Sequence, residues 1–248
     1  MQYMAPWVPA FTNAVTRQLE SNQLPFITCS FATVDSNGSP RVRTCIYRGF
    51  VFDDKKTNVI TLTTDIRMEK YEHLTSNPKF ETCFWFPTTN EQFRISGNAK
   101  ILTTSNTETF SQELGEYPLV SPTALKQYSS SLDLSNHENH HNSIHDLKPS
   151  AQEWEAELKN KWESLSRNLK SSFRKPDPGS VLTPEKQKLL DSISRGVDGS
   201  NEIDGTKNFG LVLLLPENVD YVNLNGHQSR YKHDRVDEDQ WDETEICP

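Results

Sequence analysis

The stretch LPFITCSFATVDSNGSPRVRTCIYRGFVF, residues 24–52, decides the fold. Both of its ends are rich in β-branched and aromatic residues, which is typical of strands. Between them lies DSNGSP, in which Asn37-Gly38 is a pair that tight hairpin turns favour. The stretch therefore predicts two antiparallel strands joined by a short turn.

The second of these strands carries a row of basic side chains. Because successive side chains of a strand point to opposite faces, one face would carry Arg41, Arg43, Cys45 and Tyr47. Such a row indicates either a solvated face or a cleft that binds an anion.

Further strands follow on both sides of a short helix. NVITLTT (58–64), FETCFWF (80–86) and QFRISGNAKIL (92–102) read as strands, and Gly97 suggests a bulge in the last one. A helix is expected over 66–78, where Asn77-Pro78 ends it, and another over 5–20, where apolar residues recur every four positions. Five strands joined mostly by hairpins predict an antiparallel barrel.

The region 105–207 has a different character and reads as a partly flexible, helical and polar insertion. Ser150 and Glu153 form a capping box before an apolar stripe that begins at Trp154, and we expect that stripe to pack on the barrel. Thr183 caps a second helix, which ends before Gly196. Strand character returns over 209–224 and 229–236, so the predicted fold is mainly β (α+β), with six to eight antiparallel strands, peripheral helices and a long insertion.

Composition excludes several classes of protein. The 248 residues carry a formal net charge of −8, so nucleic acid is disfavoured as a partner. The longest apolar run is about eight residues, far below the roughly 20 needed to cross a bilayer, and no signal peptide is evident. The four cysteines form no CxxC pair and are expected to be reduced. We expect the protein in the cytoplasm, with the nucleus as a further location.

Donor side chains cluster near predicted strand ends and could surround a phosphate. Arg43, Thr64, Arg67 and Lys70 would supply charge-assisted hydrogen bonds, helped by backbone amides at the start of the helix. The Gln92 amide, with a donor and an acceptor, suits the pyrimidine edge of a flavin ring. The alternative is that these arginines are solvated or ion-paired and that Thr64 only begins a turn.

Four histidines form a second cluster. His137, His140, His141 and His145 would share one face if they were helical, and imidazoles at such spacing can bind zinc. Their flanks are rich in Ser and Asn, so we expect a solvated loop and no metal site.

Several motifs, in the same order, resemble the pyridoxamine 5'-phosphate oxidase family, with the fungal homologues as the most similar branch. They are FATVDSNGSPRVRTCIYRGF, LTTDIRMEKYEHLTSNPKFETCFWF, EQFRISG and KHDR, the last near the C-terminus. The resemblance covers roughly 5–102 and 209–248. It implies a split β-barrel formed by a single domain over 1–248, and a homodimer with two FMN sites at its subunit interface.

By the same resemblance, a defined set of residues binds the cofactor FMN. The set is Arg43, Thr44, Cys45, Ile46, Thr63, Thr64, Arg67, Lys70, Gln92, Arg94 and Arg235. Arg48, Tyr231 and His233 would face the substrate, and the resemblance identifies no catalytic residue.

The departures from the family fall mainly on the substrate side. Met68-Glu69-Lys70 stands where the oxidases have Ser-Arg-Lys, Tyr231 replaces a substrate arginine, and the flavin-stacking tryptophan is absent. Three hypotheses follow: an FMN-dependent oxidoreductase of unknown substrate, a non-catalytic FMN-binding protein, and a dimeric interaction module that has lost the cofactor.

Overall fold

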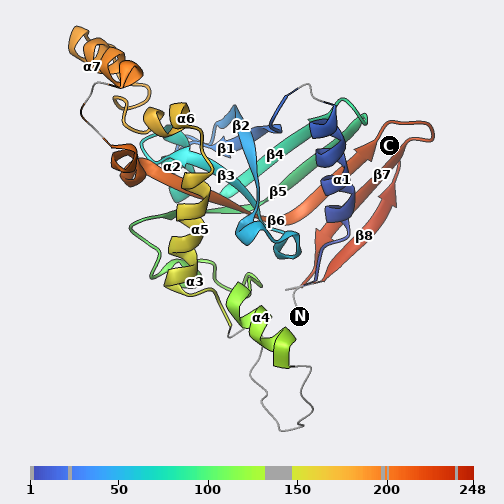
Figure 1. Cartoon of the computed structure of the whole chain (residues 1–248). Helices are drawn as coiled ribbons and strands as arrows, with labels where there is room; N and C mark the ends of the chain where they lie inside the picture. Colours follow the sequence, from blue (N-terminus) through green and yellow to red (C-terminus); the bar gives the residue numbers. More distant parts are fainter. Residues whose placement is uncertain (1–2, 22–23, 132–146, 197–198, 200, 238–239) are drawn as a thin grey trace.

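The structure of the chain is a computed structural model. It describes residues 3–21, 24–131, 147–196, 199, 201–237 and 240–248 (Figure 1). The strands are β1 (Thr28–Val34), β2 (Pro40–Phe50), β3 (Ile60–Asp65), β4 (Lys79–Phe86), β5 (Glu91–Thr103), β6 (Phe209–Asn223), β7 (Ser229–Arg235) and β8 (Trp241–Ile246). The helices are α1 (Trp7–Glu20), α2 (Glu69–Ser76), α3 (Phe110–Glu113), α4 (Pro122–Ser131), α5 (Ala151–Glu163), α6 (Arg167–Ser172) and α7 (Pro184–Arg195), with short 3-10 turns η1 (Val51–Asp53), η2 (Lys55–Thr57) and η4 (Glu202–Asn208).

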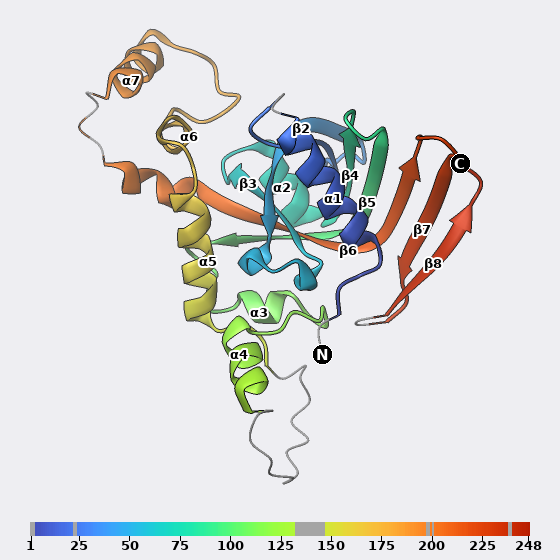
Figure 2. The same cartoon turned by 45° about the vertical axis from the view of Figure 1, so that its right-hand side comes forward.

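The eight strands form one antiparallel sheet in the order β3-β2-β1-β4-β5-β6-β7-β8. β6 also pairs with β3, so the first six strands close into a barrel. β7 and β8 continue the sheet beyond the barrel and lean away from it (Figure 2). The predicted barrel of six to eight strands is therefore confirmed.

The structure confirms the turn at Gly38 and the bulge at Gly97 that the sequence predicts in the first half of the chain. Gly38 adopts a φ of 78° in the predicted turn between β1 and β2. The register of β5 on β6 shifts between Ser96 and Gly97, which is the predicted bulge. A Cβ on Gly97 would lie 2.1 Å from the carbonyl oxygen of Leu215, so only glycine fits there.

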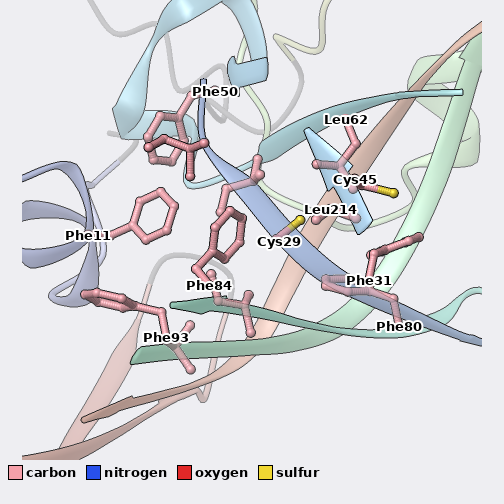
Figure 3. Packing of buried hydrophobic residues seen from close by; sticks show 14 of the residues in the cluster. Phe11, Cys29, Phe31, Cys45, Phe50, Leu62, Phe80, Phe84, Phe93 and Leu214 are labelled. Atoms are coloured by element: carbon pink, nitrogen blue, oxygen red, sulfur yellow. The ribbon is translucent and has the colours of Figure 1, made fainter. Parts of the chain in front are cut away.

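The interior of the barrel is dominated by aromatic rings. Phe11 of α1 is completely buried and points between the strands, with Phe84 at 5.0 Å and Phe93 at 5.3 Å between ring centroids (Figure 3). Cys29 and Cys45 are buried in the same core as free thiols. Helix α1 thus closes this side of the barrel with its apolar face.

A second core lies between the insertion and the barrel wall. The stripe of α5, with Trp154, Leu158 and Trp162, packs against one face of β6 through Phe209 and Leu211. The other face of β6 lines the barrel interior, which explains why its sequence is an uninterrupted apolar run. The expectation that this stripe packs on its own barrel is confirmed.

The caps of the insertion helices also match the sequence. Ser150 and Glu153 form the predicted capping box of α5, and Thr183 accepts a hydrogen bond from the Lys186 amide at the start of α7. Both views show α7 away from the barrel, and Ile193 is the one residue of this helix that is buried (Figures 1 and 2).

Candidate functional site

The face of β2 that carries Arg41 and Arg43 begins at the rim of the barrel, and its later residues, Cys45 and Tyr47, reach the core. Cys45 is buried and Tyr47 packs against the aromatic core, whereas Arg43 is only half-buried. One guanidinium nitrogen of Arg43, Nη1, donates to the Thr33 hydroxyl at 2.7 Å and to the Arg41 and Phe31 carbonyl oxygens at 2.8 and 3.2 Å. The guanidinium is therefore anchored by neutral acceptors along one edge.

Lys70, in the first turn of α2, is close enough to this guanidinium for the two charges to interact. Burial lowers the pKa of Lys70 and the charge of Arg43 lowers it further, while Cys45 and Asp65 act in the opposite direction. Its Nζ contacts the sulfur of Met68 at 3.2 Å. Within the described part of the chain neither Lys70 nor Arg43 forms an ion pair with a carboxylate. Two adjacent cations with no paired carboxylate fit a phosphate dianion.

The end of β3 borders the same place. Thr64 is buried, and its hydroxyl donates to the carbonyl oxygen of Asp65 at 3.1 Å. Thr63 is half-buried and pairs with Leu211 of β6. The site is thus bounded by β2, β3 and the start of α2.

Arg67 has a different set of partners from the one predicted. Its guanidinium binds both oxygens of Asp65, at 2.9 and 2.6 Å, and Asp177 at 3.1 Å. It also donates to the carbonyl oxygens of Phe173 and Lys175, at 3.2 and 2.8 Å. The structure therefore does not bring Arg67 together with Arg43 and Lys70 as an open donor, and this side chain joins the insertion to the end of β3.

Thr44 and Ile46 face the outside of the barrel, as do Gln92 and Arg94 on β5. Ser30 pairs with both Thr44 and Cys83, and Cys83 pairs with Arg94. Three strand-to-strand steps separate Thr44 from Arg94, which is roughly 14 Å. Within one chain these predicted FMN residues therefore share a face without meeting.

Arg94 and Gln92 have contacts of their own on this face. Arg94 forms an ion pair with Asp220, whose carboxylate also binds Arg230 at 2.8 Å. Gln92 is half-buried between its strand partners Trp85 and Val222.

The predicted residues of β7 lie on the far side of the sheet from this pair. Tyr231 stacks on Tyr221 with centroids 6.3 Å apart, and the Arg235 guanidinium lies 4.8 Å from the centroid of the Tyr117 ring. His233 is only 2% exposed. Burial lowers its pKa, although Glu243 lies 3.4 Å from its Nδ1. Arg235 also lines a cavity of about 500 Å³ with Lys100 and Glu217.

Arg48 lies in β2 where the register of this strand on β3 shifts, between Tyr47 and Phe50. It is half-buried, burial lowers its pKa, and its Nε has no hydrogen-bond partner among the described residues. Its carbonyl oxygen accepts a hydrogen bond from Lys161 of α5.

Sequence reasoning missed two residues near the site. Thr33 anchors Arg43 and also contacts His73 of α2, at 3.0 Å. Lys161 reaches β2 from the insertion, and the sequence contains a signal for it, because Glu157 and Lys161 fall on the buried helical face that Trp154 and Trp162 define.

The histidine cluster at 137–145 lies outside the described residues. No described helix is long and apolar enough to span a membrane.

Comparisons with known proteins agree with this geometry. Residues 4–103 match the family model of the pyridoxamine 5'-phosphate oxidase, FMN-binding domain. The uncharacterized protein YGR017W of Saccharomyces cerevisiae is 36% identical and aligns over 99% of both chains. The pyridoxine/pyridoxamine 5'-phosphate oxidase 2 of Arabidopsis thaliana is 26% identical over 91% of this chain and 87% of its own.

A solved structure extends the likeness over the insertion. The pyridoxamine 5'-phosphate oxidase-related, FMN-binding protein of Nostoc punctiforme superposes with a TM-score of 0.68 at 26% identity, and 98% of each chain is covered. The chain therefore belongs to the pyridoxamine 5'-phosphate oxidase-like family, and it carries the FMN-binding domain of that family.

Proposed function

We propose that the protein is an FMN-dependent oxidoreductase in which Arg43 and Lys70 bind the flavin phosphate. The observation that carries the proposal is that these two partly buried cations are close enough for their charges to interact, and that neither has a carboxylate partner among the described residues. Thr44, Cys45, Ile46, Thr63 and Thr64 would line the cofactor. When bound, FMN supplies a ring that accepts a hydride, and the protein contributes positioning and electrostatics.

The proposal includes a homodimer, because one chain does not bring all predicted residues together. Gln92, Arg94 and Arg235 would reach the flavin of a second copy. The outer barrel face supports this, since Val42 and Trp85 are exposed there by 65% and 46%. A cavity of about 300 Å³ on this face is lined by Thr44, Phe26 and Trp85.

The test is the visible absorption of purified protein after addition of FMN and desalting, together with its mass in solution. We expect about one flavin per chain in a dimer. Arg43→Ala and Lys70→Ala should each weaken FMN binding roughly ten- to a hundredfold, because each removes charge-assisted bonds of about 1.5–3 kcal/mol. Lys79→Ala, an exposed lysine paired with Glu217, is the matched control and should bind normally. Unchanged FMN affinity in both site variants would contradict the assignment.

A non-catalytic FMN-binding protein is the second candidate, and Tyr231 favours it. This side chain occupies the position of a substrate arginine in the family and stacks on Tyr221. Candidate reductants added under anaerobic conditions separate the two, because an oxidoreductase loses its flavin colour with its substrate and a binding protein does not.

A further inference from the structure

One buried hydroxyl, that of Thr33 in β1, joins the two elements that carry the cations of the phosphate site. Nη1 of Arg43 in β2 donates to this hydroxyl at 2.7 Å, and Nδ1 of His73 in α2 lies 3.0 Å from it. Thr33 is only 2% exposed and His73 only 8%. The hydroxyl therefore links β2, β1 and α2 in a place from which water is largely excluded.

The direction of these two hydrogen bonds follows from the donors and acceptors present. A guanidinium only donates, so the Thr33 oxygen accepts from Arg43. The hydroxyl proton remains, and His73 Nδ1 is the acceptor that it meets among the residues that the structure describes. Because a buried hydroxyl proton without an acceptor is costly, Thr33 donates to Nδ1. This hydroxyl thus serves once as acceptor and once as donor.

Helix α2 is held on the barrel by two neighbouring residues of different chemistry. Leu74 is buried in the barrel core and fixes how deeply the helix packs. His73 adds the polar contact with Thr33, and it lies three positions after Lys70, so these two side chains share a face of the helix. The bond to Thr33 therefore fixes the rotation of α2 about its axis, and with it the position of Lys70.

We propose that Thr33 and His73 are positioning residues of the phosphate site. The Thr33 hydroxyl fixes the guanidinium of Arg43. Its bond to His73 fixes the start of α2, so that the two cations keep the spacing at which both bind one phosphate dianion. These residues thereby give the protein its preference for FMN over riboflavin, which has the same ring and no phosphate. The inference rests on the proposed function for the identity of the ligand, and it adds residues that do not touch that ligand.

The test compares the affinity of the full chain for FMN with its affinity for riboflavin, by calorimetric titration. Thr33→Val removes the hydroxyl and keeps the shape of the side chain. It should weaken FMN binding about tenfold and leave riboflavin binding within about twofold of the wild type. The visible spectrum of the FMN-saturated variant should match that of the wild type, because the surroundings of the ring are unchanged. This spectrum is the second readout if riboflavin binds too weakly to titrate.

Further variants show whether the hydrogen bonds themselves are responsible. His73→Leu should weaken FMN binding about threefold to tenfold, whereas His73→Asn keeps an acceptor near the position of Nδ1 and Thr33→Ser keeps the hydroxyl, so both should stay within about threefold of the wild type. The double variant Thr33→Val/His73→Leu should bind FMN within about threefold of Thr33→Val, since both changes remove the same bond. Thr75→Val, which removes an exposed hydroxyl of α2, is the matched control and should bind both flavins normally.

Three results would overturn the inference. The first is normal FMN affinity in Thr33→Val alongside weakened binding in Arg43→Ala. The second is an equal loss of affinity for both flavins, or a shifted flavin spectrum, in Thr33→Val, since either indicates a general loosening of the structure. The third is failure of Thr33→Ser and His73→Asn to preserve binding.

Two complications have defined outcomes. If Thr33→Val does not fold, His73→Leu and His73→Asn decide the question by the same measurements. Failure of the proposed function is a separate result, in which the wild type retains no FMN or both Arg43→Ala and Lys70→Ala bind it normally, and it overturns this inference as well.

Discussion

The barrel and the insertion between β5 and β6 are held by different kinds of contact. In the barrel, the single side chain of Phe11 makes ring contacts with five aromatic residues of the surrounding strands. The insertion packs on the barrel through the second apolar core, and ionic side chains add contacts at defined points: Lys161 on β2 and Arg67 on Asp177. The barrel is thus held by apolar contacts, whereas the insertion is held by apolar contacts together with a few ionic ones.

The largest effect is expected in the barrel. Phe11→Ala should lower the free energy of unfolding by about 3–5 kcal/mol, since it leaves a cavity among rigid rings that cannot collapse into it. Urea denaturation measures this change. Leu19→Ala, a partly exposed position on the same helix, is the control. A loss below about 1 kcal/mol in Phe11→Ala would show that the aromatic cluster is not the main source of barrel stability.

An intermediate effect is expected where the two regions join. Arg67→Ala leaves the buried Asp65 carboxylate without its partner and frees two carbonyl groups of the insertion, at a cost of about 1–3 kcal/mol. Hydrogen exchange should quicken in α6 and η4 and remain unchanged in β1 and β4. Arg41→Ala, which breaks the surface pair with Asp35, provides the comparison.

The same variant decides between two roles of Arg67. FMN affinity should stay within about threefold of the wild type if the side chain serves only the insertion. A loss of more than about tenfold would restore it to the phosphate site, where the family motif places it.

The smallest effect is expected from pH. Burial alone would raise the pKa of Glu153, but hydrogen bonds from Ser150, Ser121 and Thr123 outweigh it and lower the pKa from 4.5 to about 2. Because the folded state favours the carboxylate, this stabilisation is complete above pH 4.5 and is lost as the pH falls towards 2.

Solvent screening limits that contribution to about 1 kcal/mol. Glu153→Gln should remove it, so that the unfolding midpoint of the variant changes less between pH 5 and 3 than that of the wild type. The exposed neighbour Glu155 gives the control, Glu155→Gln. An identical pH profile in Glu153→Gln and the wild type would show that this carboxylate does not stabilise the insertion.

Local sequence patterns predicted the helices, strands and turns, whereas long-range contacts determined which strands pair and how the barrel closes. The hairpin at Asn37-Gly38, the bulge at Gly97 and the caps at Ser150 and Thr183 depend on neighbours in sequence, so the sequence predicts them. The pairing of β6 with both β3 and β5 depends on chain closure over more than a hundred residues, which no local pattern encodes.

The candidate site shows the same division. Arg43 and Lys70 could be expected to converge because strand, turn and helix lie close in sequence. The partners of Arg67, at Phe173, Lys175 and Asp177, lie more than a hundred residues away and were not predictable from its motif. Lys161 is the opposite case: it was missed, although the helical period puts it on the buried face that Trp154 and Trp162 define.

The late position of β6 in the sequence has a consequence for synthesis of the chain. The insertion, roughly a hundred residues, must be translated after β5 before the strand that closes the barrel exists. At typical elongation rates this takes about 5–20 s, during which the hydrogen-bonding edges of β3 and β5 have no partner strand. The length of the insertion therefore sets how long the nascent sheet is open to association with other chains, and how long chaperones have to shield it.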